Sequence, residues 1–560
     1  MNYSGDLISM AKTGPIIVLD PGKERTKGKE AIFMNITAAK AVASLVQSTL
    51  GPKGMDKMLI NKLGMVSMTN DGVTILKDIG IEHPAAKMIV EVSKTLESTA
   101  GDGTTSSVIL SAALLDKAEK LIKKGIHPTV IVKGFKTAED KALEILNDRA
   151  ISVNFKTPEG RAILKKAAMT SITGKAPDVH KEMLADICVK ATEIIEKDGF
   201  VDVRSDVISI VELNKKIEET EVIEGIALST NSLNKKAPKI IQNPKIAIFD
   251  AEIEAHKTKA KSKMVVGSPE ERNQIIENEH QNMLDIAKQI ADTGANVIFS
   301  TKMVKPIVLE YFDKRGIYVS RPIEEKDAEH VSYATGAKVI RNPREISAQD
   351  LGEAGLMEQD PRADGGKTFI RDSKKSKVAT IIIRGETLQH ADSVDTSVDD
   401  ALWVVKSIIE DGKVMAGGGA PEIEVALALR AFAPTVDGYE QRVISAYADA
   451  VEEIPKTLIR NGGLDVIDLT LALRTAHLKD KNAGVNVFSG KIVDMEKEGV
   501  VEPLRVKINS IKSATEAAIM ILRIDDVLRA KHIREVPDVK PEHMATSYSG
   551  MAPPQLNERR

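Results

Sequence analysis

The chain has 560 residues, 42% of them hydrophobic and 28% charged, and its 78 basic side chains nearly balance its 81 acidic ones. The length exceeds what one ordinary core can hold, so we expect several domains, and the balanced charge gives no reason to expect a nucleic acid or a membrane as a partner. The first residues, MNYSGDLISMAKTG, have neither a basic start nor a continuous apolar stretch, and no later segment offers about eighteen uninterrupted apolar residues, so we expect a cytoplasmic protein.

Residues 36–155 are predicted to form mostly amphipathic helices separated by glycines. The clearest helical segment is SSVILSAALLDKAEKLIKKG. Five apolar residues recur in it at the spacing of one helix face: Val108, Ala112, Leu115, Ala118 and Ile122. Gly125 is expected to end this helix, since glycine is common just past a helix terminus and the lysines before it suit the negative helix end. A second strongly helical region is predicted for residues 420–530.

The region between these two helical parts has a different pattern. Short β-branched runs such as VISIVEL, KIAIFD, NVIFST and VATIIIRG alternate in it with helical segments, which is typical of an α/β structure. We therefore expect a mixed α/β body inserted between two helical halves.

One predicted helix within this body carries few large apolar side chains. It begins at Ser268, Pro269 and Glu270, a favourable helix start, and its first three turns contain only Ile275 and Ile276 as large apolar residues. We expect such a helix to project beyond its own core. The charged stretch before it, AEIEAHKTKAKSKMVVGSP, is compatible with a flexible surface loop. The polar last residues, HMATSYSGMAPPQLNERR, predict a disordered tail.

A run of small residues opening into the first long helix is a candidate phosphate site. It consists of Gly101, Asp102, Gly103, Thr104, Thr105 and Ser106. Backbone amides at a helix start bind anions, glycines allow a phosphate to approach the backbone closely, and Asp102 is placed to hold a magnesium ion that bridges phosphate oxygens. An ordinary helix cap is the alternative interpretation of the same residues.

Two further glycine segments could also bind phosphate. The run Gly417, Gly418 and Gly419 precedes a helix with proline near its start, which repeats the first arrangement. The other run is Leu50, Gly51 and Pro52, at the end of a helix. Taken by itself, this last run is explained by a helix stop followed by a turn.

Two aspartates are candidates for chemistry. Asp71 lies in TNDG between the apolar runs MVSM and VTIL, which predicts a β-hairpin turn that would by itself explain the aspartate. Asp400 lies beside the apolar face of a helix whose stripe includes Val398, Ala401 and Val405. A carboxylate at the margin of a core needs a partner such as a metal, a lysine or a polarised water. A solvated aspartate in an acidic helix is the alternative.

Several common enzyme classes have no motif in this chain. The patterns GxxxxGK[ST], GxGxxG after a strand and HExxH are absent, so P-loop ATPases, Rossmann dehydrogenases and zinc peptidases are not indicated. The ten histidines lack metal-ligand spacing. The single cysteine, Cys188, excludes an intrachain disulfide and a multi-thiolate metal site, and we expect it to be a buried thiol.

The chain resembles the group II chaperonins along nearly its whole length. The segments that carry this resemblance are RTKGKEAIFMNITAAKAVA, LGPKGMDKML, TNDGVTILKDI, EHPAAKM, AGDGTTSSVIL, GIHPTVI, MTSITGK, DLGEAGL, DDALWVV, GGGAPEIE, GVVEPLRVK and SATEAAIMILRIDD. Their number and order make the resemblance specific.

The resemblance implies a multidomain α and α/β fold with equatorial, intermediate and apical domains. The implied helical equatorial domain comprises residues 1–157 and 412–560, and the small intermediate domain comprises 158–225 and 385–411. The implied apical domain is the inserted α/β body, residues 226–384, and the helical lid protrusion lies near 255–285. Hinges are expected near Gly225 and Gly385, because each is a glycine at a strand boundary.

The resemblance also implies a site for ATP and Mg²⁺. The three glycine-containing runs described above would line the phosphates, and Asp102 would hold Mg²⁺. Asp71 and Asp400 would position or deprotonate the attacking water, and Lys175 would sense the γ-phosphate. Glu502 would hold the ribose, and Asn486 would belong to the same nucleotide site. Such an arrangement suits phosphoryl transfer, where positioning and charge neutralisation supply most of the catalysis.

The implied function is ATP hydrolysis that closes a built-in lid over an unfolded protein and promotes its folding in a ring chamber. The expected partners are unfolded proteins and identical or related subunits in a double ring, without nucleic acid or membrane. A weakly hydrolysing structural or regulatory subunit of a mixed ring is one alternative, against which the intact Asp71, Asp102 and Asp400 argue. A soluble metabolic phosphotransferase is another, but no small-substrate motif supports it.

Overall fold

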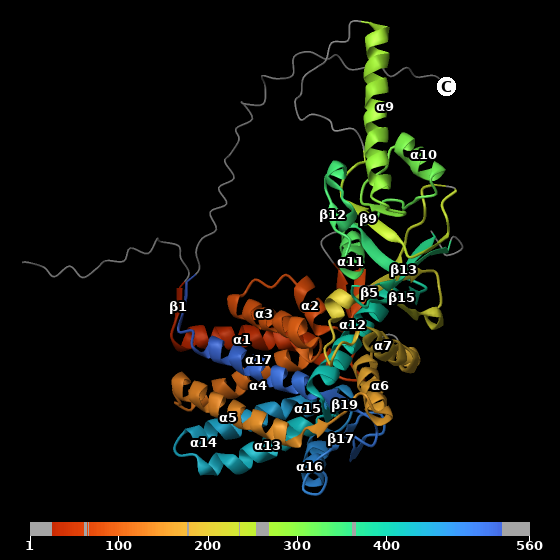
Figure 1. The fold of residues 1–560 in the computed structure, drawn as a ribbon. Helices are drawn as coiled ribbons and strands as arrows, with labels where there is room; N and C mark the ends of the chain where they lie inside the picture. Colours follow the sequence, from red (N-terminus) through yellow and green to blue (C-terminus); the bar gives the residue numbers. More distant parts are fainter. Residues whose placement is uncertain are drawn as a thin grey trace, which may run out of the picture. The chain divides into compact units, whose positions relative to one another are not determined.

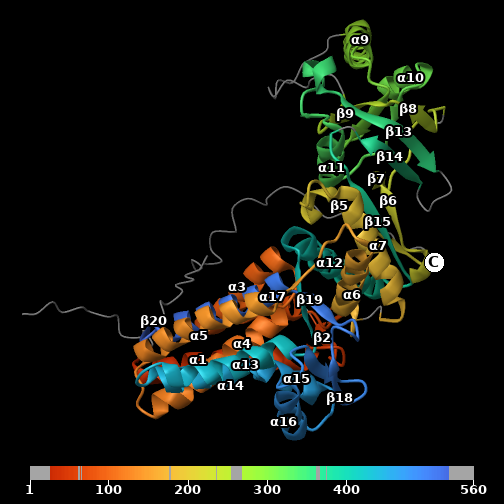
Figure 2. The ribbon, with the colours of Figure 1, turned by 60° about the horizontal axis from the view of Figure 1, so that its bottom comes forward.

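The computed structural model describes residues 25–60, 64, 66–175, 178–234, 236–253, 268–360, 366–373 and 375–528 (Figures 1 and 2). The chain forms two compact units, one made of Met1–Met34 with Ile524–Arg560 and the other of Asn35–Arg523. The predicted C-terminal tail and most of the predicted lid segment before residue 268 lie outside the described residues.

The first unit joins the two ends of the described chain. Strand β1 (Arg25–Lys27) pairs antiparallel with β20 (Asp526–Leu528), with Thr26 opposite Val527. The amide of Gly28 then donates a hydrogen bond to the carbonyl of Asp525 at 2.6 Å. Helix α1 (Lys29–Val46) continues from this unit into the second, where the short 3-10 helix η1 (Gln47–Thr49) follows it.

Helices from both halves of the sequence pack together in the second unit, as predicted. Their bounds are α2 (Gly72–Asp78), α3 (Pro84–Ala100), α4 (Thr104–Lys123), α5 (Pro128–Arg149), α13 (Ala420–Phe432), α14 (Glu440–Val451), α15 (Glu453–Asn461), α16 (Val466–Ala476) and α17 (Leu504–Leu522). Figure 1 shows α17 lying along α4 and α5, which it contacts together with α3. The ring of Phe135 meets Tyr447 edge-on at 5.5 Å, and the Tyr447 hydroxyl shares a buried hydrogen bond with Thr515 at 2.7 Å.

Helix α4 confirms the predicted amphipathic pattern. All five residues of its predicted apolar stripe are buried. Gly125 follows the helix end with a φ of +86°, and the amide of Ile126 bonds back to the carbonyl of Leu121 at 3.1 Å. This left-handed glycine satisfies the last carbonyls of the helix, as expected for a glycine stop.

Small antiparallel sheets connect these helices. Strand β16 (Lys413–Ala416) pairs on one side with β4 (Ile151–Ser152) and on the other with β19 (Val501–Pro503). The other two sheets are the pairs β2 (Lys57–Ile60) with β3 (Val66–Thr69), and β17 (Ala483–Asn486) with β18 (Lys491–Asp494). The sheet centred on β16 brings residues from three distant parts of the chain together.

The predicted hairpin turn at Asp71 is wrong. The segment VTIL after it belongs to α2, and Asp71 is the N-cap of that helix, where its side chain accepts a hydrogen bond from the Thr74 amide at 2.7 Å. The hairpin lies one element earlier, between β2 and β3. An aspartate suits either a turn or an N-cap, and Val73, Ile75 and Leu76 are buried on the helix.

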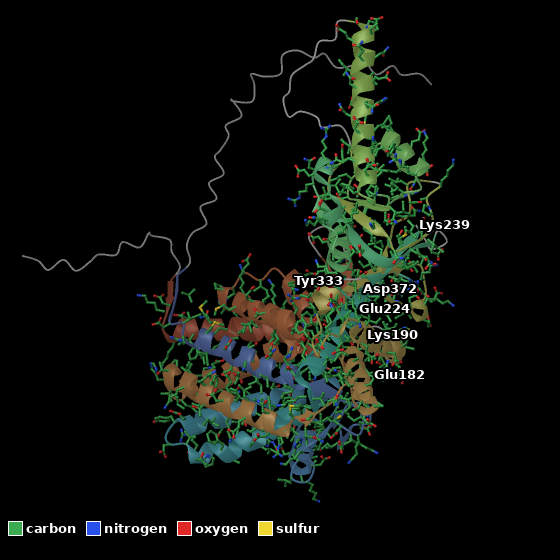
Figure 3. The ribbon with its side chains drawn as sticks, in the orientation of Figure 1. Glu182, Lys190, Glu224, Lys239, Tyr333 and Asp372 are labelled. Carbon is green, nitrogen blue, oxygen red and sulfur yellow. The ribbon has the colours of Figure 1, made fainter. Side chains whose placement is uncertain are left out.

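A second packing layer contains α6 (Pro158–Ile172), α7 (Lys181–Ile195), α8 (Val203–Asp206) and α12 (Leu388–Asp411). They adjoin a sheet in which β15 (Ala379–Gly385) lies between β5 (Val207–Leu213) and β6 (Glu221–Glu224). Helix α7 is amphipathic: Glu182 and Lys190 are exposed (Figure 3), whereas Cys188 is fully buried. Burial raises the pKa of the Cys188 thiol, which confirms the expectation of a buried thiol.

The predicted α/β body between the helical halves is present. Its described strands lie in the order β11, β10, β9, β13, β14, β7, and in addition β12 pairs with β9 and β8 with β13. Their bounds are β7 (Ile226–Leu228), β8 (Ile240–Gln242), β9 (Lys245–Phe249), β10 (Val297–Ser300), β11 (Tyr318–Val319), β12 (Val339–Ile340), β13 (Gly352–Asp360) and β14 (Lys367–Ser373). Along β9, Ile246 and Ile248 pack toward the core that includes α11 (Glu325–Thr335), while Ala247 and Phe249 pack toward α9 (Pro269–Asp292) and α10 (Pro306–Lys314). Successive strand residues therefore serve opposite faces of the sheet.

Helix α9 confirms the prediction of a helix that extends past its core. Ser268 caps it by accepting a hydrogen bond from the Glu271 amide at 3.2 Å. Its buried residues, from Met283 to Ile290, all lie in the second half, and Ile275 in the first half is 39% exposed. The first half stands clear of the neighbouring elements in Figure 1.

One helical stretch in the described part of the chain, Lys29–Thr49, is long and apolar enough to cross a membrane by length and composition alone. The core helix of a soluble protein can pass the same test, and Ile36, Ala39 and Val42 of this stretch are buried inside the protein.

Candidate functional site

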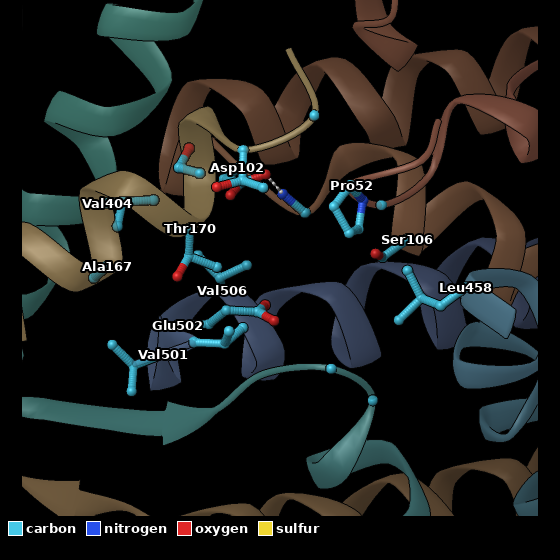
Figure 4. Close-up of a pocket in the computed structure, with 18 of the residues that line it drawn as sticks. Pro52, Asp102, Ser106, Ala167, Thr170, Val404, Leu458, Val501, Glu502 and Val506 are labelled. Carbon is cyan, nitrogen blue, oxygen red and sulfur yellow. Dashed lines mark hydrogen bonds between the residues drawn. The ribbon is translucent and has the colours of Figure 1, made fainter. Parts of the chain in front are cut away.

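Segments from both helical halves and from the layer between them line one cavity of about 710 Å³. Figure 4 shows Pro52, Asp102 and Ser106 from the first half, Thr170 from α6 and Glu502 from β19 around this space. The glycine runs that were separate candidates in the sequence therefore open onto the same cavity.

The two glycine runs that precede helices have nearly the same geometry. Gly103 is the N-cap of α4 with a φ of +81°, and Gly419 is the N-cap of α13 with a φ of +82°. Both are left-handed conformations that glycine adopts without steric cost. The positive ends of two helices thus face one cavity, and this arrangement favours a ligand with several negative charges.

The third run, Leu50 to Pro52, lies at the end of η1 and completes this wall of the cavity. Gly174 packs directly on Pro52, since a Cβ placed on Gly174 would lie 2.6 Å from the Pro52 Cα. Asn70 donates a hydrogen bond to the Gly174 carbonyl at 2.9 Å. These contacts hold the turn that carries Lys175 against both the Leu50 run and the loop before α2.

The N-cap role of Asp71 places its carboxylate at the edge of the cavity. Its amide donates a hydrogen bond to Thr69 Oγ1 at 3.1 Å while its side chain caps α2. Thr105 of α4 lies beside this helix start, with its Oγ1 2.4 Å from where a Cβ on Gly72 would be. The first turns of α2 and α4 are therefore neighbours.

An ion pair between Lys175 and Asp400 lies at the centre of the lining residues. Burial raises the pKa of Asp400 to about 7, because desolvation outweighs the attraction of Lys175. Burial alone would lower the pKa of Lys175, but the negative charges of Asp400, Asp102 and Asp71 raise it. The lysine thus stays charged, while the Asp400 carboxylate can exchange a proton near neutral pH.

A second buried ion cluster lines the cavity beside β16. Glu502 lies opposite Met415 in the antiparallel pair of β19 with β16. Lys507 bonds both to Glu502 at 2.6 Å and to Glu422 at 3.0 Å. The second carboxylate oxygen of Glu422 is buried and has no hydrogen-bond partner among the described residues. Burial raises the pKa of Glu502, and although burial alone would lower the pKa of Lys507, the two glutamates raise it.

The cavity collects nearly all of the predicted site residues. Those that line it are Leu50, Gly51, Pro52, Asp71, Asp102, Gly103, Thr104, Thr105, Ser106, Lys175, Asp400, Gly418, Gly419, Asn486 and Glu502. Gly417 does not line it, but a Cβ there would lie 2.9 Å from Glu502 Oε1. The side chain of Asn486 accepts hydrogen bonds from the amides of Phe488 and Ser489.

The sequence interpretation missed Lys507 and Glu422 as lining residues. Both occur in segments that carried the resemblance, GVVEPLRVK and GGGAPEIE. A buried glutamate requires a nearby cation, but nothing in the sequence identifies which lysine supplies it.

The lining residues are compatible with Mg²⁺ that arrives together with phosphates. In the part of the chain that the structure describes, no group of three or more His, Cys, Asp or Glu side chains could hold a metal ion by itself. Protein sites for Mg²⁺ commonly supply only one or two carboxylates, with phosphate oxygens and waters completing the shell. Asp102 fits this mode, because it lines the cavity at the start of α4 while its Oδ1 accepts a hydrogen bond from the Gly103 amide at 2.6 Å.

Comparison with known proteins shows to which proteins this chain is similar. The family model described as "TCP-1/cpn60 chaperonin family" matches residues 42–532. The "Thermosome subunit beta" of Archaeoglobus fulgidus is 45% identical over 93% of this chain and 96% of its own length. The "Thermosome subunit" of Methanocaldococcus jannaschii is 44% identical over 94% and 97%, and that of Pyrococcus horikoshii is 42% identical over 96% and 98%.

Proposed function

Because the chain belongs to the TCP-1/cpn60 chaperonin family, in its group II branch with the thermosome subunits, we propose that it folds other proteins by hydrolysing ATP in the cavity described above. Membership itself implies chaperone-assisted protein folding. The ATPase activity, the nucleotide site and the enclosure of clients are our proposals, and each is supported by particular residues.

The observation that carries the ATPase proposal is the convergence of charge around the cavity. Two helix N-termini that face the cavity favour a polyanion, and Asp71, Asp102, Asp400 and Lys175 line the same cavity. Phosphoryl transfer requires this combination of donors for the phosphates and carboxylates for the metal and the attacking water. A site that only bound nucleotide would not need the half-buried Lys175–Asp400 pair.

We assign the binding of the triphosphate to the backbone at Gly103 and Gly419 together with the Leu50 run. Asp102 would hold Mg²⁺, which when bound neutralises phosphate charge. Glu502, oriented by Lys507, would accept hydrogen bonds from the ribose hydroxyls. Asn486 lies in the same lining and would contact the nucleoside.

The Lys175–Asp400 pair suggests how proton transfer depends on substrate. The Lys175 ammonium group has three N–H donors, so a γ-phosphate that takes one of them weakens the attraction of Lys175 for Asp400. Because Lys175 lowers the pKa of Asp400, this weakening raises that pKa and makes the carboxylate a stronger acceptor for a proton of the attacking water. Asp71, fixed as the cap of α2, orients that water.

The equatorial, intermediate and apical domains are proposed to couple hydrolysis to client enclosure, with the bounds predicted above except between residues 384 and 385. That boundary would assign most of β15 to the apical domain, whereas its pairing partners β5 and β6 belong to the intermediate domain. The pairing therefore favours a boundary that keeps β15 together with β5 and β6. The extended first half of α9 supports the described part of the lid predicted near 255–285, which begins at Ser268. We further propose a cytoplasmic double ring of identical or related subunits.

The experiment is a native mass measurement of the purified chain with and without Mg-ATP, with phosphate release and refolding of an unfolded client followed in the same samples. A ring-sized particle that releases phosphate and increases client refolding is expected. A particle that assembles without releasing phosphate would favour a structural subunit of a mixed ring. Hydrolysis by a monomer that does not refold a client would refute the proposed chaperone mechanism.

A further inference from the structure

A side chain outside the cavity holds one of its walls in place. Asn461 is the last residue of α15, and its side-chain Nδ2 donates hydrogen bonds to the carbonyl of Gln47 at 2.9 Å and to that of Leu50 at 2.8 Å. These partners lie 414 and 411 positions away in the sequence. The Gln47 carbonyl also accepts a hydrogen bond from the Leu50 amide at 3.5 Å, and Leu50 is the C-cap of η1, so Asn461 caps η1 from a different helix.

Helix α15 also contacts two of the three glycine segments that face the cavity. Leu458 Cδ2 lies 2.3 Å from where a Cβ on Gly51 would be, and Pro455 Cβ lies 2.6 Å from where a Cβ on Gly419 would be. One short helix therefore sets the spacing between the Leu50 run and the N-terminus of α13. The two hydrogen bonds of Asn461 fix the end of this helix to the Leu50 run.

We propose that Asn461 is a positioning residue for nucleotide binding, acting through the Leu50 carbonyl and the backbone of Gly51 and Pro52. The proposal rests on the function proposed above and deepens it, because it assigns part of the affinity to a residue that does not line the cavity. Lys175 and Asp400 lie on other elements, so Asn461 acts on binding and not on the chemical step.

The substitution Asn461→Asp tests the amide with almost no change in shape. An ionised aspartate donates no hydrogen bond, and it places negative charge against two carbonyl oxygens. We expect the Kd of the full-length protein for Mg-ADP, measured by calorimetry, to rise about tenfold, which corresponds to about 1.4 kcal/mol. The KM for ATP should rise similarly, while kcat should change less than about twofold. This pattern is expected when the lost interaction stabilises the bound substrate and the transition state equally.

Two further variants separate positioning from folding. Asn461→Ser removes both hydrogen bonds without adding charge, and it should weaken Mg-ADP binding less than Asn461→Asp does. Asn342→Asp is the matched control: its Nδ2 also donates to an oxygen, Glu345 Oε1 at 2.7 Å, but it caps the short helix η4 (Pro343–Glu345), none of whose residues lines the cavity. This control should bind Mg-ADP as the unmodified protein does.

The outcomes distinguish this proposal from the function it rests on. If the unmodified protein does not bind Mg-ADP, the proposed function fails. If it does bind, but Asn461→Asp binds equally well, or loses kcat with an unchanged KM, the positioning role is overturned. Thermal unfolding by circular dichroism checks the fold, and failure of both Asn461 variants to fold would overturn the proposal by making the residue structural.

Discussion

The pH dependence of hydrolysis should report the protonation of Asp400. Burial raises the pKa of this carboxyl to about 7, well above the usual range for an aspartate. A carboxylate that accepts a proton must be ionised, so activity should fall as the pH falls through this value. With a pKa of about 7, the ionised fraction drops from about nine-tenths at pH 8 to about one-tenth at pH 6, roughly a tenfold loss.

The assay is phosphate release at limiting ATP across this pH range, because kcat/KM reports the groups of the free enzyme. An aspartate with an ordinary pKa would give a flat profile over the same range. Lys175 lowers the pKa of Asp400, so Lys175→Met should move the midpoint of the remaining activity to higher pH. Thermal unfolding at each pH serves as the control for loss of the folded protein.

A flat kcat/KM profile between about pH 6 and pH 8 would contradict the role of Asp400 as the proton acceptor. A midpoint that stays unchanged in Lys175→Met would contradict the effect of Lys175 on the pKa of Asp400. If both results were found, the assignment of these two residues to proton transfer would have to be abandoned.

Three further predictions concern other parts of the chain. Asp400→Ala should abolish phosphate release while leaving ATP binding largely intact, and equal loss of both would contradict its action on the attacking water. Glu452 is fully buried among three basic side chains, so Glu452→Gln should lower the free energy of unfolding by about 3–5 kcal/mol in a denaturant titration. As the control, Glu453→Gln, at a partly exposed ion pair, should lower it by at most about 1 kcal/mol. Similar losses in the two variants would contradict the argument that burial makes Glu452 important. Trp403, the single tryptophan, packs on Gly101 at the edge of the cavity, so binding of Mg-ADP should change its fluorescence emission. An unchanged emission spectrum at saturating Mg-ADP would show that this contact does not report nucleotide binding.

Much of the local structure could be predicted because it depends on residues that are close in the sequence. The apolar stripe of α4 and the glycine after it required only helical spacing and a left-handed residue at the helix end. The strands β5, β9, β10 and β15 followed from β-branched runs. Asp71 marks the limit of such reasoning, since an aspartate before a short apolar run suits both a hairpin turn and a helix cap.

Local patterns and motifs were sufficient to predict the family, the alternation of helical and α/β regions and a part of the cavity lining. Which charges meet depends on tertiary packing. The pairing of Lys175 with Asp400, 225 positions away, and the bonds from Asn461 to Gln47 and Leu50 depend on how distant helices pack. The pKa of Asp400 likewise follows from burial, which packing creates and no run of neighbouring residues specifies.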